Sequence, residues 1–165
     1  MERVSREPAL PQSHATERKE GQHSMDGSSH FLEPTVRPGP TAPTVLLLSR
    51  DLIFTTKVTG TARDLGCQVL VAGNRDLALS WIEQGSPATV LVDLSAGDLG
   101  SPDALAAYRK LAGATVRFVA FGAHVDVEAL AAAKQAGCDE VMPRSKFTAE
   151  LPRLIKESLN QNRAQ

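Results

Sequence analysis

Short apolar runs recur along most of the chain, and longer stretches with apolar residues at helical spacing separate them. The runs lie at residues 45–48, 68–72, 89–93, 116–121 and 140–142. Apolar runs of this length without polar alternation are typical of strands in a parallel sheet that is buried on both faces. The pattern therefore predicts a strand followed by a helix five times over, which gives a parallel sheet with right-handed crossovers and helices on both faces.

Residues that begin and end helices support this order of elements. Asp51 and Asp126 stand where their side chains can accept the first free backbone N–H groups of a helix. Gly66 and Gly137 are stop signals. The predicted apolar faces are Ile53, Val58, Ala62 and Leu65 in the first helix, and Leu105, Tyr108 and Leu111 in the third. The last helix is expected to begin near Thr148, because Pro152 is tolerated only in a first turn.

The first 43 residues differ from the rest of the chain. They are rich in Ser, Glu, Arg, His, Gly and Pro and have few large apolar residues, so we expect a disordered tail. Residues 34–43 are expected to form a stiff, extended linker, and docking of a partner is an alternative role for the tail. The predicted folded domain covers residues 44–160, and residues 161–165 form a short C-terminal tail. A chain of 165 residues holds one such domain with a real core.

Composition excludes several functions. The net charge of −1 and the 4% of aromatic residues give no support for binding nucleic acid. No apolar run is long enough to span a bilayer and no secretory signal is present, so we expect a cytoplasmic protein. Cys67 and Cys138 match no metal or redox spacing and are interpreted as small buried residues. His124 is interpreted as a surface-loop residue. No glycine-rich nucleotide-binding motif is found.

Asp93 is the main candidate for chemistry. It ends the apolar run Thr-Val-Leu-Val-Asp, and an open α/β sheet places its sites at the carboxyl ends of its strands. The Gly- and Ser-rich loop at residues 95–102 follows it directly, in a position where loops tend to be functional.

Residues 44–160 resemble the CheY-like receiver domain of bacterial response regulators. The likeness rests on Val-Leu-Val-Asp93-Leu, on Ala-Gly137-Cys-Asp-Glu-Val and on the order of the elements. It implies a flavodoxin-like (βα)5 fold with three layers and the strand order 2-1-3-4-5. It also implies that Asp93 is the phospho-acceptor of the family and that the protein acts in signal transduction.

The sequence departs from the family at the other site positions. The acidic pair that binds Mg²⁺ after the first strand is replaced by Ser49 and Arg50, and only Asp51, one residue later, is acidic. The remaining replacements are Gly122 at the Thr or Ser position, Arg144 at the Lys position, Ser145 at the Pro position and Val141 at the aromatic switch position. One carboxylate beside an arginine is a poor magnesium site, so Asp51 and Asp93 are only weak metal candidates.

These departures favour a stand-alone degenerate receiver that is not an enzyme, needs no cofactor and acts through protein contact. A histidine kinase or another regulator is a possible partner, a homodimer is also possible, and the resemblance places docking on the fourth helix, fifth strand and last helix. We hypothesise that Arg50 pairs with Asp93. One alternative is a genuine Mg²⁺-dependent receiver that a histidine kinase phosphorylates on Asp93. Another is a small flavodoxin-like enzyme or ligand-binding domain that uses the loop at residues 95–101.

Overall fold

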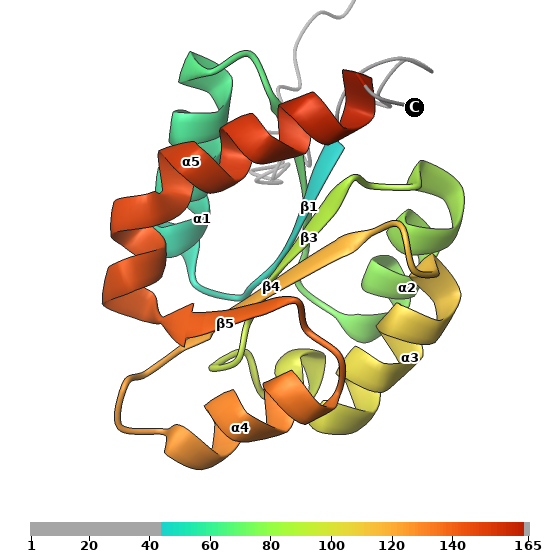
Figure 1. Cartoon of the computed structure of the whole chain (residues 1–165), viewed down its shortest axis with the longest axis vertical. Helices are drawn as coiled ribbons and strands as arrows, with labels where there is room; N and C mark the ends of the chain where they lie inside the picture. Colours follow the sequence, from blue (N-terminus) through green and yellow to red (C-terminus); the bar gives the residue numbers. More distant parts are fainter. Residues whose placement is uncertain (1–43, 164–165) are drawn as a thin grey trace, which may run out of the picture. The chain divides into compact units, whose positions relative to one another are not determined.

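A computed structural model describes residues 44–163, which form a parallel five-stranded sheet flanked by helices (Figure 1). The strand order β2-β1-β3-β4-β5 confirms the predicted flavodoxin-like fold. The strands are β1 (Thr44–Leu48), β2 (Gln68–Ala72), β3 (Thr89–Asp93), β4 (Arg117–Gly122) and β5 (Glu140–Pro143). The helices are α1 (Leu52–Asp64), α2 (Arg75–Gly85), α3 (Pro102–Ala112), α4 (Val127–Gln135), α5 (Arg144–Arg163) and a 3₁₀ turn, η1 (Gly97–Gly100). The predictions for residues 1–43 and 164–165 lie outside the described residues.

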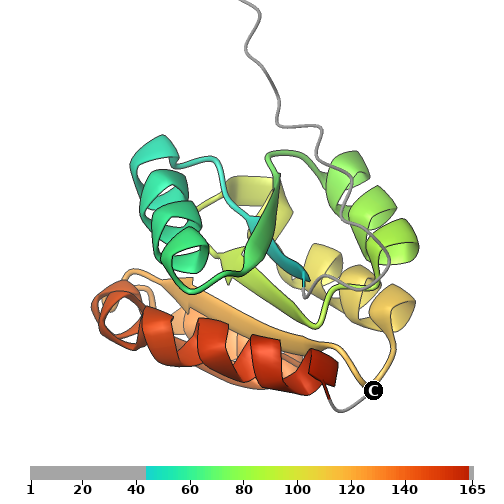
Figure 2. The same cartoon turned by 90° about the horizontal axis from the view of Figure 1, so that it is seen from above.

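The sheet separates two apolar clusters. Helices α1 and α5 cover one face, and α2, α3 and α4 cover the other (Figures 1 and 2). The central strand β3 is buried along its whole length, as its continuous apolar run predicts. The cluster under α1 and α5 contains three phenylalanines in mutual contact, Phe54, Phe121 and Phe147.

Side-chain caps fix where four helices begin. The side chains of Asp51, Asn74, Ser101 and Asp126 each accept a backbone N–H in the first turn of the helix that follows. The predicted caps Asp51 and Asp126 are therefore confirmed. All four helices begin at the carboxyl ends of strands, so capping also brings polar side chains to that edge of the sheet.

The last helix begins earlier than predicted. It starts at Arg144, not near Thr148, and it contains Pro152 in its interior. The missing N–H of Pro152 costs one hydrogen bond. Burial of Phe147, Leu151 and Leu154 against the sheet favours the longer helix. The apolar contacts of α5 therefore outweigh the local preference on which the prediction relied.

Two predicted core positions are wrong. Ile53 is 85% exposed, and its neighbour Phe54 packs into the core instead. Leu111 is 43% exposed, whereas Leu105 and Tyr108 are buried as predicted. In α1 the buried positions are Phe54, Val58 and Ala62, which repeat every four residues. The predicted stripe shares Val58 and Ala62 with the observed one and differs in its first residue. The approximate spacing used for the prediction did not show whether Ile53 or Phe54 faces the core.

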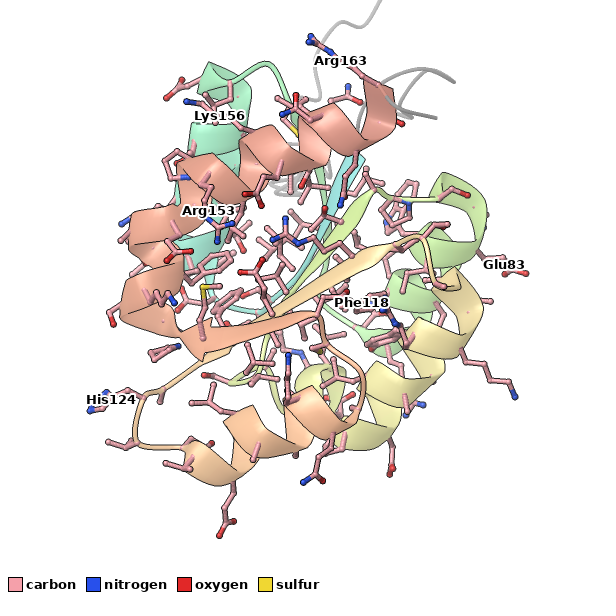
Figure 3. All side chains as sticks on the ribbon, viewed as in Figure 1. Glu83, Phe118, His124, Arg153, Lys156 and Arg163 are labelled. Carbon is pink, nitrogen blue, oxygen red and sulfur yellow. The ribbon has the colours of Figure 1, made fainter. Side chains whose placement is uncertain are left out.

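A network of ion pairs joins α5 to the neighbouring strands. Arg117 of β4 pairs with Glu140 of β5 and with Glu157 of α5. The more exposed Arg153, which Figure 3 labels, pairs with both acids as well. Arg153 also pairs with Glu150. Arg153 thus pairs with three acids although its side chain is 43% exposed. Within residues 44–163, no helix is long and apolar enough to cross a membrane.

Candidate functional site

Asp93 lies at the carboxyl end of the central strand β3, as predicted, and is only 1% exposed. Its Oδ2 accepts a hydrogen bond from the Ser49 hydroxyl at 3.0 Å. Its Oδ1 accepts one from the backbone N–H of Ser95 at 3.0 Å. A buried carboxylate needs such donors and an opposite charge, because its transfer out of water is costly.

The opposite charge comes from Arg144, the first residue of α5. Its Nη2 lies 2.8 Å from Asp93 Oδ1 and 3.2 Å from the Ser95 hydroxyl. Its Nη1 lies 3.2 Å from Asp51 Oδ2. The guanidinium thus bridges the carboxylates that follow β1 and end β3, using the fork geometry that a lysine ammonium lacks.

Aromatic rings hold the Arg144 side chain in this position. Its guanidinium carbon lies 5.0 Å from the centre of the Phe54 ring and 6.0 Å from that of Phe121. Phe121 stacks on Phe147 with ring centres 4.0 Å apart. A cation over an aromatic face gains about 0.5–2 kcal/mol. Sequence reasoning included Arg144 in the site but missed this platform, because its members come from three distant elements.

Asp51 and Ser49 complete the cluster around Arg144. Asp51 Oδ1 accepts the Phe54 N–H as the cap of α1, so both of its carboxylate oxygens are engaged. The Ser49 hydroxyl accepts the Asp51 N–H at 3.1 Å while it donates to Asp93. Every side-chain oxygen of the two aspartates therefore has a donor. Among residues 44–163, no group of three or more His, Cys, Asp or Glu side chains could hold a metal ion.

Arg50 lies outside this cluster, and the hypothesis that it pairs with Asp93 is wrong. Its Nε donates to the Gly73 carbonyl at 2.8 Å, and its Nη2 lies 2.8 Å from Asp98 Oδ1. Arg50 therefore links the loops that follow β1, β2 and β3. Asp98 was missed as its partner because nothing local in the sequence relates the two residues.

Gly122 and Gly100 mark close approaches around the end of β3. A Cβ on Gly122 would lie 3.3 Å from the Cβ of Leu94, so that side chain fills the space beside it. A Cβ on Gly100 would lie 2.8 Å from the Asp93 carbonyl oxygen, which brings η1 directly onto the strand end. Val141, at the aromatic switch position of the resemblance, is partly buried against the α2, α3 and α4 cluster. His124 is exposed in the loop after β4 and points away from the fold, as predicted (Figure 3).

No protein-family model and no curated protein matches the sequence. Solved structures do match the fold. A CheY-like receiver domain protein from Methanospirillum hungatei JF-1 superposes with a TM-score of 0.64 at 19% identity, covering 74% of this chain and 98% of that one. The chain has the fold of a response-regulator receiver domain.

Two further receiver domains give the same result. The receiver domain of the Francisella response regulator 1452 has a TM-score of 0.62 at 18% identity, covering 74% of this chain and 99% of that one. The receiver domain of an HD domain-containing protein from Pseudomonas fluorescens Pf-5 has a TM-score of 0.64 at 15% identity, with 75% and 99% covered. At these identities the likeness concerns the receiver fold.

Proposed function

We propose that this chain is a receiver-like signalling module that acts through contact with a protein partner, without magnesium-dependent phosphorylation of Asp93. The observation that carries the proposal is the Arg144 guanidinium, which pairs with both Asp93 and Asp51. In this proposal the guanidinium supplies permanently the positive charge that a bound metal ion supplies to a working receiver during phosphoryl transfer.

The residues present do not fit a magnesium ion. Magnesium takes near-octahedral oxygen ligands, usually one or two carboxylates together with phosphate oxygens and water. Here all four carboxylate oxygens of Asp51 and Asp93 already accept hydrogen bonds from Arg144, Ser49 or backbone N–H groups. A metal ion at this position would have to displace the guanidinium, whose positive charge would repel it.

Partner contact is the remaining route for a signal in this proposal, and the face formed by α4, β5 and α5 is a docking surface by resemblance to the receiver family. The partner would be another regulator or a histidine kinase that binds without transferring a phosphoryl group. We do not propose an enzyme built on the loop at residues 95–101, because Gly100 packs against the backbone of Asp93 and Leu94.

The test is phosphorylation by a small-molecule acyl phosphate with Mg²⁺, read by the intact mass of the full chain. We expect no phosphoryl adduct, while a competent receiver labelled in parallel gains one. The Asp93→Asn variant is the control for the site of any adduct. An adduct that disappears in this variant would overturn the proposal.

That result would instead support the second candidate, a genuine phospho-accepting receiver. Its basis is that Asp93 remains at the end of β3 with a cation in contact, and Arg144 could pair with a phosphoryl group. A Mg²⁺ titration followed by NMR then shows whether the metal binds first. The phospho-accepting reading requires saturable binding that Asp93→Asn weakens.

A further inference from the structure

Exposed large apolar side chains concentrate at one edge of the sheet. Within residues 44–163, five large hydrophobic residues are exposed, and four of them are Leu52 (72%), Ile53 (85%), Val125 (75%) and Val127 (67%). Leu52 and Ile53 begin α1, and the two valines flank the start of α4. All four lie at the carboxyl ends of the strands, a region named here the carboxyl edge.

Arg144, the first residue of α5, lies at the same edge. It bonds to Asp51, which directly precedes Leu52. It follows Pro143, whose neighbour across the sheet is Gly122 at the end of β4, just before the loop that carries the valines. Figure 1 shows the starts of α1, α4 and α5 at the same end of the strands. The carboxyl edge thus has an α1 half and an α4 half, which belong to opposite faces of the sheet.

The two halves carry opposite charges that have no partner within residues 44–163. Lys57 lies one helical turn after Ile53 and is exposed, with no ion pair there. Glu128 directly follows Val127 and is also exposed and unpaired in the same range. By contrast, the charges between β5 and α5 are already paired with one another. The carboxyl edge therefore combines exposed apolar side chains with one unpaired charge of each sign.

We infer that two copies of this chain associate face to face through the carboxyl edge. A two-fold axis in the plane of the edge sets the α1 half of one copy against the α4 half of the other. Leu52 and Ile53 then meet Val125 and Val127, and Lys57 meets Glu128, with each contact made twice. Such an isologous interface must be self-complementary, and these six side chains are so in both polarity and charge.

The size of the surface predicts a weak dimer. A stable interface buries about 800 Å² per partner, and four aliphatic side chains supply only part of that area. We expect a dissociation constant of roughly micromolar order.

Sedimentation equilibrium of the full chain over a wide concentration range tests the inference. Ile53→Asp and Val127→Asp should each shift the chain to the monomer. Lys57→Glu and Glu128→Lys should each weaken the dimer about tenfold, because each reversal changes two contacts in the symmetric interface. The double reversal should restore the dimer, since every contact is then again between opposite charges.

Matched controls separate this effect from a general change in charge. Lys156→Glu on α5 and Glu83→Lys on α2 alter exposed side chains that point away from the edge, and they should leave association unchanged (Figure 3). A chain that stays monomeric to about 1 mM overturns the inference. So does a dimer that is insensitive to the single reversals or is not restored by the double one. The phosphoryl-adduct measurement is independent of these outcomes, so the inference and the proposed function can fail separately.

Discussion

Removing the Arg144 guanidinium should destabilise the domain because it leaves a buried carboxylate without its opposite charge. The informative substitution is Arg144→Met, which keeps an apolar stem over the Phe54 ring. Loss of one partner from a fully buried ion pair costs about 3–5 kcal/mol. Arg144 is one-third exposed, and Asp93 keeps its bonds to Ser49 and Ser95, so we expect about 2 kcal/mol.

Urea denaturation followed by circular dichroism measures this loss. A domain of this size loses about 1.5 kcal/mol of unfolding free energy per molar urea, so the midpoint should fall by about 1–1.5 M. Arg50→Met is the matched control, because Arg50 makes an ion pair with Asp98 at the same edge, with side chains 47% and 64% exposed. That exposed pair should contribute under about 1 kcal/mol.

A double-mutant cycle with Asp93→Asn isolates the charge pairing. The neutral amide at position 93 no longer needs a cation, so Arg144→Met should then cost only about 0.5–1 kcal/mol. The coupling between the two positions should be about 1–1.5 kcal/mol. A coupling under about 0.5 kcal/mol would refute the argument that Arg144 serves to compensate the Asp93 charge.

Three further results are expected. Gly122→Ser should lower the unfolding free energy by about 1–3 kcal/mol in a urea titration, because its Cβ would press on Leu94. Burial raises the pKa of the Cys67 and Cys138 thiols to about 11, so both should resist alkylation at pH 8 in the native protein and react in urea. Hydrogen bonds from two guanidinium groups lower the pKa of Glu157. Its stabilising effect is therefore present above the ordinary carboxyl pKa and lost as pH falls through the lowered value, and Glu157→Gln should flatten the acid side of the stability profile, measured by thermal melting.

The elements that carry strong local patterns could be read from the sequence. The run ending in Asp93 lies in the predicted strand, and Asp51 and Asp126 cap the predicted helices, because burial and capping are written into adjacent residues. The start of α5 was misplaced because Arg144 has no capping signal before it and Pro152 suggested a later start. Packing against the sheet decided that boundary.

The pairing within the candidate site could not be read in this way. Arg144 and Asp93 are 51 positions apart, and Arg50 and Asp98 lie in different loops. Both arginines reach the same edge, so their charges alone did not show which one would meet Asp93. The aromatic rings beneath Arg144 distinguish them, and that platform exists only once α1, β4 and α5 are packed together.

Ser49 limits which single substitutions this site can accept without losing stability. Its hydroxyl donates to Asp93 and accepts from Asp51, so an acidic residue there would remove a donor and add a third negative charge beside one guanidinium. Exchanging Arg144 for lysine first would forfeit the bridge between the two aspartates. Either change made alone is therefore unfavourable. Each of these side chains is therefore constrained by its neighbours, and a substitution at one position requires a compensating change at another.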